Sequence, residues 1–144
     1  MLRLGSMSLH RVDFETLIRP STPNTFLMAP DDLCQAAEVD KAPPVFSVAP
    51  AKLRQAFLSV VIAQPRVSHT LADEPELYDD FVQRSAVFHF PDLVSVQFLA
   101  HGKAGATLAL YSRSVYGRSD FGVNRARSLR WLKLLDGAVK PSSR

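Results

Sequence analysis

Apolar residues follow two different periods along this chain. Between residues 51 and 63 they recur every three or four positions, the spacing of one face of an α-helix. These positions are Leu53, Ala56, Phe57, Val60 and Val61. Pro50 suits the first turn of such a helix, and Pro65 would end it. From residue 66 onward the period falls to two, which is typical of strands with one buried face.

The second period predicts a run of strands joined by short turns. The predicted strands cover residues 66–71, 76–85, 93–99 and 106–114. An acidic turn at 72–75 and a glycine-containing connection at 101–105 are short, which makes the strands they join antiparallel neighbours. Residues 87–90 are apolar, and Pro91 with Asp92 is predicted as a turn pair that stops them. A further short strand is predicted at 45–48.

The chain is predicted to close with a second helix and to begin with an irregular arm. The helix covers residues 120–136, with Gly137 as its C-terminal stop. Its expected core stripe is Val123, Ala126, Leu129, Leu132 and Leu135, widened by Trp131. The arm, 1–44, shows no sustained period and contains five prolines, which lack a backbone donor and restrict the preceding residue.

These elements predict one globular domain of the α+β class. The irregular arm at 1–44 packs on the domain through its apolar residues. Residues 45–144 form a single antiparallel sheet of four or five strands, with two main helices packed on one face.

The composition is that of a globular domain. The 144 residues are 47% hydrophobic and 22% charged, unlike a disordered chain. No apolar run approaches the roughly 18 residues of a membrane-spanning helix, so we expect a soluble chain. Cys34 is the single cysteine, which excludes an internal disulfide and is more typical of a small apolar residue than of a nucleophile. Without CxxC, HxH or HExxH spacing, neither a metal nor a cofactor is expected.

Charge is distributed unevenly along the chain. Residues 1–102 carry a net charge of −4, and residues 103–144 carry +7. The acids gather between Asp73 and Asp80, whereas arginines gather near the C-terminus. Nucleic-acid binding is disfavoured because no RNP, KH or zinc-finger signature is present and the first two-thirds of the chain is acidic. We expect the basic residues of the last helix to lie on its solvent side; these are Arg125, Arg127, Arg130 and Lys133.

The best candidate site is the strand-to-helix corner at residues 111–125, YSRSVYGRSDFGVNR. A helix N-terminus offers free N–H groups and partial positive charge, and arginine forks beside it are typical of carboxylate or phosphate sites. The expected ligand-binding residues are Arg113, Arg118, Ser119, Asp120, Asn124 and Arg125. We therefore favour a non-enzymatic binding domain that recognises an anionic small molecule, a lipid headgroup or a protein partner. The oligomeric state stays open.

Other interpretations stay open beside this one. Asp120 suits an ordinary helix cap. Arg113 could instead form a buried pair with Asp120 or with one of the acids between Asp73 and Asp80. A hydrolase could use Asp120 or a histidine as base; the histidines near the predicted sheet are His69, His89 and His101. No GxSxG elbow is present, and a purely structural or assembly role is the third alternative.

The run SRSVYGRSDFGVNRARSLRWL, together with Pro23 and Asn24, resembles the DUF1499 family over about residues 23–136. The matching motif positions are Ser112, Arg113, Ser114, Gly117, Ser119, Asp120, Gly122, Asn124 and Arg125. The resemblance implies a strand–helix–strand region before the motif and a closing helix after it. Thr25 stands where many members have cysteine, and the hydrophobic N-terminal segment of many members is missing. The family is one of unknown function; the resemblance implies a bacterial protein, cytoplasmic or associated with the cell envelope.

Overall fold

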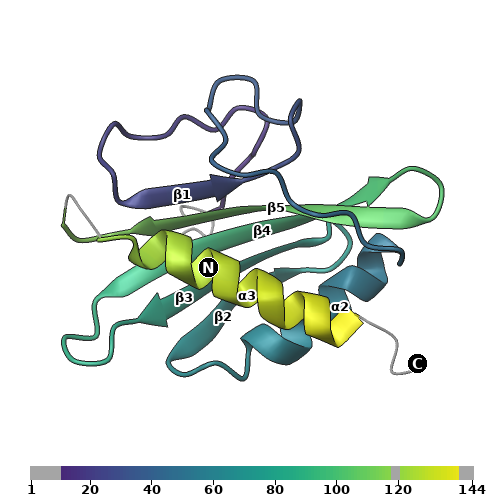
Figure 1. Ribbon diagram of the computed structural model, residues 1–144. Helices are drawn as coiled ribbons and strands as arrows, with labels where there is room; N and C mark the ends of the chain where they lie inside the picture. Colours follow the sequence, from purple (N-terminus) through teal and green to yellow (C-terminus); the bar gives the residue numbers. More distant parts are fainter. Residues whose placement is uncertain (1–10, 118–120, 140–144) are drawn as a thin grey trace.

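The computed structural model describes residues 11–117 and 121–139, and Figure 1 shows their arrangement. In these ranges five strands and two helices follow one another as β1 (Thr25–Met28), α2 (Pro50–Val61), β2 (Val67–Asp73), β3 (Tyr78–Arg84), β4 (Pro91–His101), β5 (Gly105–Ser114) and α3 (Val123–Val139). The strands form one antiparallel sheet in the order β1-β5-β4-β3-β2. The predicted α+β fold with a single antiparallel sheet is confirmed.

The arm contributes the edge strand that the sequence pattern missed. β1 pairs with the end of β5, with Thr25 opposite Arg113 and Met28 opposite Leu110. The next part of the arm covers the outer edge of β1: Asp40 N–H donates to the Leu27 carbonyl, and Ala29 N–H donates to the carbonyl of Lys41. The opposite edge strand, β2, carries an irregularity between His69 and Leu71.

Three local predictions are wrong. Residues 45–48 form only an isolated bridge between Phe46 and Ala106, because the prolines at 43, 44 and 50 leave few donors for a ladder. Pro91 begins β4 instead of stopping a strand, a position where its missing N–H is tolerated, and residues 86–88 form the turn. Gly137 lies inside α3, which continues to Val139.

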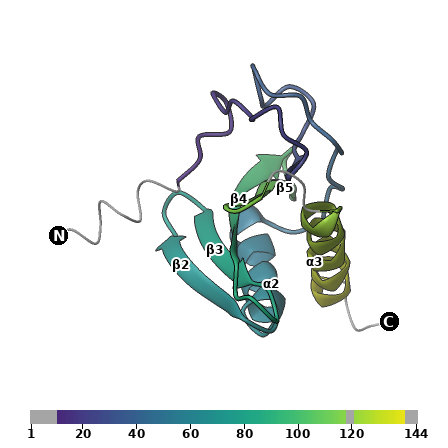
Figure 2. The same ribbon diagram turned by 90° about the vertical axis from the view of Figure 1, so that its left-hand side faces the viewer.

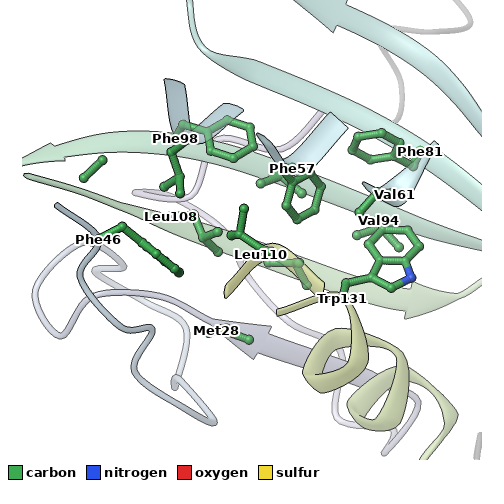
Figure 3. Close-up of a cluster of buried hydrophobic side chains, with 14 of the residues drawn as sticks. Met28, Phe46, Phe57, Val61, Phe81, Val94, Phe98, Leu108, Leu110 and Trp131 are labelled. Atoms are coloured by element: carbon green, nitrogen blue, oxygen red, sulfur yellow. The ribbon is translucent and has the colours of Figure 1, made fainter. Parts of the chain in front are cut away.

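Helices α2 and α3 cover one face of the sheet and enclose the main core. Figure 3 shows Phe57 of α2 between Phe98, Phe81 and Trp131. Its ring centroid lies 5.4 Å from that of Phe98, 5.8 Å from that of Phe81 and 6.1 Å from that of Trp131. These tilted and edge-on contacts are the preferred geometries of aromatic pairs.

The buried face of α3 differs from the predicted stripe. Its buried residues are Asn124, Arg127, Ser128, Trp131 and Leu135, whereas Val123 and Ala126 are exposed. The second half of the helix therefore packs by apolar burial, and the first half packs by polar contacts. Neither helix of the described chain is long and apolar enough to cross a bilayer.

The arm covers the other face of the sheet, arching over it at the top of Figure 2. A second core forms there from Phe14, Leu27, Ala29, Tyr78, Ala109 and Tyr111. Cys34 is half buried beside this core, and burial raises the pKa of its thiol. A raised pKa keeps the thiol protonated, which disfavours a nucleophilic role.

A buried ion pair joins α2 to the sheet. Arg54 donates two hydrogen bonds to Asp79, with Nε 2.7 Å from Oδ2 and Nη2 2.9 Å from Oδ1. His69 Nε2 lies 2.8 Å from Asp79 Oδ1, and its ring stacks on Phe81. Asp79 is fully buried, and these hydrogen bonds offset the cost of removing its carboxylate from water.

Replacing Asp79 tests this dependence. Asp79→Ala leaves the buried Arg54 guanidinium without its carboxylate, and we expect the free energy of unfolding to fall by about 3–5 kcal/mol. The matched control is Asp73→Ala, which breaks the exposed pair of Arg11 with Asp73 and is expected to cost less than about 1 kcal/mol. Urea unfolding at pH 7 measures the free energy of unfolding of both variants. Equal losses would contradict a stabilising role of the buried Arg54–Asp79 ion pair.

Candidate functional site

The strand-to-helix corner lies at one end of the sheet, where β5 ends and α3 begins (Figure 1). The β3–β4 turn reaches the same end, because β3 and β4 are antiparallel and Arg84 pairs with Pro91. Val115 N–H donates to the Pro91 carbonyl across 3.4 Å, which joins the two connections.

Asn124 is the centre of a buried polar network on the helix-covered face. Its side-chain oxygen accepts hydrogen bonds from Ser112 Oγ at 2.6 Å and Arg127 Nη1 at 2.8 Å. Its amide nitrogen donates to Ser114 Oγ at 2.9 Å and to the Asn24 carbonyl at 3.1 Å. The side chain is therefore occupied by internal partners at both its oxygen and its nitrogen.

Asn24 brings the arm into the same network. Its amide nitrogen donates to the Gly117 carbonyl at 2.7 Å, and its backbone carbonyl accepts from Ser114 N–H at 3.1 Å. Thr22 Oγ1 donates to its side-chain oxygen. Gly117 has φ of +85°, a conformation that glycine adopts without strain, and this lets the chain leave β5 sharply.

Arg127 extends the network to β3 and β4. Its Nε donates to Gln83 Oε1 at 2.6 Å, and its Nη2 donates to Asp92 Oδ2 at 2.6 Å. Nη1 also reaches Ser112 Oγ at 3.0 Å. The residue is only 5% exposed, so its predicted place on the solvent side of the helix is wrong. The desolvation of the guanidinium is offset by these charge-assisted bonds.

Arg113 lies on the opposite face of the sheet, beneath the arm. Its Nη1 donates to Ser95 Oγ at 2.9 Å and to the Tyr111 carbonyl at 3.2 Å. Its guanidinium carbon lies 5.0 Å from the centre of the Tyr111 ring. Burial lowers the pKa of this guanidinium, while the nearby Asp80 carboxylate opposes that shift.

Asp80 is the acid beside Arg113, joined to it through Ser95. One carboxylate oxygen of Asp80 accepts from Tyr78 OH at 2.7 Å and from Ser95 Oγ at 2.6 Å. Its other oxygen is buried without a hydrogen-bond partner in the described structure. Burial raises the pKa of Asp80 and also that of Tyr78. Ser95 Oγ thus links Arg113 to Asp80, one of the acids considered as a buried partner of Arg113, and the pair itself stays a prediction.

The outward side of the corner is apolar and basic. Arg125 is exposed, with its guanidinium carbon 5.4 Å from the centre of the Phe26 ring. Phe121 is 95% exposed and has φ of +52°, an uncommon conformation for a bulky residue. The Tyr116 ring contacts Phe90 of the β3–β4 turn at 5.3 Å, and Phe90 stacks on Phe88 at 5.4 Å. We name this the aromatic end surface: Val87, Phe88, Phe90, Val115, Tyr116 and Phe121.

The structure does not gather all the predicted ligand residues around one point. Asn124 is buried under α3, Arg125 beside it is exposed, and Arg113 is on the other face of the sheet. Arg118, Ser119 and Asp120 lie outside the described residues, and so does the predicted helix cap at Asp120. Whether Arg113, Asn124 or Arg125 contacts a ligand stays a prediction.

Sequence reasoning missed the roles of Asn24, Arg127 and the two phenylalanines at 88 and 90. Asn24 was noticed only through the family resemblance. Arg127 lies three residues after Asn124, a spacing that places both on one helix face, and this signal was available. Residues 87–90 were predicted only as an apolar run that Pro91 and Asp92 stop, whereas the structure has a turn at 86–88 and a positive φ of 58° at His89.

Other chemical groups are dispersed. His69 belongs to the Arg54–Asp79 pair, while His89 is exposed in the β3–β4 connection and His101 is exposed at the end of β4. In the described residues no cluster of three or more His, Cys, Asp or Glu side chains could hold a metal.

An open hollow of about 500 Å³ lies between the arm and the sheet, lined by Arg11, Val12, Asp13, Phe14, Glu76 and Gln97. Its lining has both charge signs, and the corner does not contribute to it.

Asn124→Ala tests the internal role of this residue. Removing the amide breaks its hydrogen bonds with Ser112, Ser114, Arg127 and the Asn24 carbonyl in a buried site, and we expect a loss on the order of 3 kcal/mol in unfolding free energy. The neighbouring control Arg125→Ala removes only an exposed contact with Phe26 and should cost less than about 1 kcal/mol. Chemical denaturation of both variants measures these free energies of unfolding. A loss in Asn124→Ala as small as that in Arg125→Ala would show that the Asn124 network does not stabilise the fold.

The raised pKa of Asp80 predicts that the stability of the protein depends on pH. Because the folded protein holds the Asp80 proton more tightly than the unfolded chain, its contribution to stability falls as pH rises above 3.8, the ordinary pKa of this group. Asp80→Asn cannot ionise and keeps an acceptor oxygen, so its stability should improve relative to the natural protein between about pH 4 and 7.

A second variant sharpens this prediction. Tyr78→Phe removes a hydrogen bond that lowers the pKa of Asp80, so it should steepen the loss of stability with rising pH. Urea unfolding across the same pH range measures all three proteins. Parallel profiles would show that Asp80 does not titrate differently in the folded state.

The chain matches the family model described as "Protein of unknown function (DUF1499)" over residues 18–135. A comparison with proteins of curated function finds no match. Among solved structures, the crystal structure of Ara h 8.0201 is similar at 12% identity and a TM-score of 0.47, covering 80% of this chain and 96% of that chain. Because the family model spans most of the chain and includes both Asn24 and the corner motif, the resemblance is confirmed and the chain belongs to the DUF1499 family.

Proposed function

We propose that this protein is a non-enzymatic interaction domain that recognises an anionic partner at the end of the sheet. The recognition surface is the outward side of the corner 111–125 together with the β3–β4 turn. One observation carries the proposal: the inward polar groups of the corner are engaged inside the protein, whereas its outward groups are exposed aromatic and basic side chains. Large aromatic side chains exposed together are typical of interaction sites.

The chemistry of the described residues supports binding more than catalysis. A nucleophile needs a base within hydrogen-bond reach. Ser112 Oγ instead donates to Asn124, and His69 Nε2 is held by Asp79. The buried polar groups are thus arranged as a rigid frame, which suits a surface that has to present fixed side chains to a partner.

The exposed arginines supply the attraction for an anion. Arg125 stands at the start of α3, and Arg84 ends β3 with its Nη1 bound to the His89 carbonyl at 2.9 Å. Arginine binds phosphate and carboxylate groups through paired N–H donors. Arg118, from the same corner, would add to this charge in the sequence.

Thermal unfolding in the presence of anions tests the proposal. The probes are inorganic phosphate, glycerol phosphate, a dicarboxylate and vesicles of anionic phospholipid. Binding to the folded state stabilises it by about 2.7 kcal/mol at a hundredfold excess over Kd, which raises Tm. We expect at least one probe to do so, and the double variant Arg84→Gln/Arg125→Gln to lose the effect.

Lys103→Gln is the matched control, because Lys103 is an exposed cation on the β4–β5 turn at the other end of the sheet. It should keep the full response. If none of the four probes binds by thermal shift or sedimentation, or if the control loses the response as well, recognition of an anion at this surface is refuted.

A further inference from the structure

The aromatic end surface is carried by two chain connections that extend past the strand ends. Figure 1 shows the β3–β4 turn, the end of β5 and the start of α3 at the left-hand end of the sheet. Phe88 is 72% exposed and Tyr116 is 60% exposed, although both belong to one row of ring contacts through Phe90. The rings are therefore held in place by each other while their outer faces stay in contact with water.

The charges around this surface are positive. Arg66, Arg84 and Arg125 are all exposed, and Arg66 Nε donates to the Arg84 carbonyl at 2.9 Å, which keeps these two side by side. Among the described residues of 84–92 and 115–125, Asp92 is the only carboxylate, and Arg127 neutralises it at 2.6 Å. An anion that approaches this end therefore meets cations without an opposing free carboxylate in the described part.

The far end of the sheet has the opposite sign. The end of β2 and the β2–β3 turn carry three carboxylates, Asp73, Glu74 and Glu76, against two cations at the same end, Arg11 and Lys103. Arg11 pairs with Asp73 at 2.8 Å. The charge is therefore polarised along the strands. A negatively charged plane attracts the arginine end, repels the acidic end and so orients the molecule with its aromatic side chains toward the plane.

We infer that the aromatic end surface docks on a lipid bilayer that contains anionic phospholipids. Phe88, Tyr116 and Phe121 enter the headgroup boundary, and Arg84 and Arg125 contact lipid phosphates. Tyrosine and phenylalanine on projecting loops suit this boundary, because an apolar body enters the lipid while polar tips and neighbouring cations stay wet. This inference rests on the proposed function and names its anionic partner.

Vesicle sedimentation of the full chain tests the inference. Vesicles of phosphatidylcholine alone are compared with vesicles that contain about 30% phosphatidylglycerol, an anionic lipid. We expect binding to the anionic vesicles only, weakened when sodium chloride is raised from about 0.1 to 0.5 M. Arg84→Gln should lower the partition coefficient about fivefold. Phe88→Ser/Tyr116→Ser should lower it at least about tenfold.

Two control variants show whether loss of vesicle binding is specific to the aromatic end surface or follows from removing any exposed apolar or basic side chain. Val45→Ser removes an apolar side chain that is 52% exposed, near the β4–β5 end of the sheet. Lys103→Gln removes a cation from that same end. Both controls should bind vesicles as the natural protein does, and circular dichroism should show all variants folded, since every substituted side chain is exposed.

Each alternative result has a definite meaning. If glycerol phosphate raises Tm but anionic vesicles do not bind, the membrane inference is overturned and the proposed function stands. If neither binds, both fail. If vesicles bind equally well to Phe88→Ser/Tyr116→Ser, the surface is wrongly assigned. If sedimentation velocity shows that the natural protein dimerises and Phe88→Ser/Tyr116→Ser does not, a second copy covers the surface and the inference is overturned.

Discussion

The contact between two asparagines holds the described fold together at one end. Asn124 donates to the carbonyl of Asn24, and the same carbonyl accepts the N–H of Ser114. One peptide group thus joins the arm, the last strand and the closing helix, although Asn24 and Asn124 lie 100 residues apart along the chain. Buried amides and carbonyls that lose their partners cost free energy, so these three elements depend on one another at this point.

This contact also gives a physical reason for much of the family motif. Ser112, Ser114 and Asn124 bond one another, and Gly117 accepts from Asn24 where the chain leaves the sheet. Arg113, in the middle of the same motif, faces the other side of the sheet and reaches Asp80 through Ser95. Alternation along one strand therefore supplies two separate polar networks, one under each covering layer.

The sequence predicted the fold where periodicity is strong and failed where polar groups are buried. The repeats of two and 3.6 located α2 and the four long strands, because burial of one face imposes those repeats. Strand β1 was not predicted, because four residues between prolines are too few to show a hydrophobic period. The face of α3 was misassigned because hydrophobicity ranks Val123 above Arg127, while the structure buries Arg127 with Gln83, Ser112 and Asp92 as partners.

The sequence singled out a candidate site by its residue types, but it did not predict the directions in which the side chains point. The corner 111–125 was singled out for its arginines and hydroxyls, and most of those described turn inward. Phe88 and Phe90 lie 28 and 26 residues before Tyr116, and no local pattern connects them to it. Only the pairing of β4 with both β3 and β5 brings them together. A pairing of this kind is a property of topology, which a linear pattern does not contain.

The two edges of the sheet limit how any partner can approach. Along β1, the arm occupies the backbone groups of Leu27 and Ala29 that an added strand would need. Along β2, the irregularity between His69 and Leu71 breaks the even spacing of donors and acceptors that strand addition requires. Helices cover one face of the sheet and the arm covers the other. The structure therefore disfavours edge-to-edge assembly of the sheet into fibres. Both edge features disfavour the pairing of a further chain with the sheet edges, which leaves the side chains at the strand ends as the better contact surface.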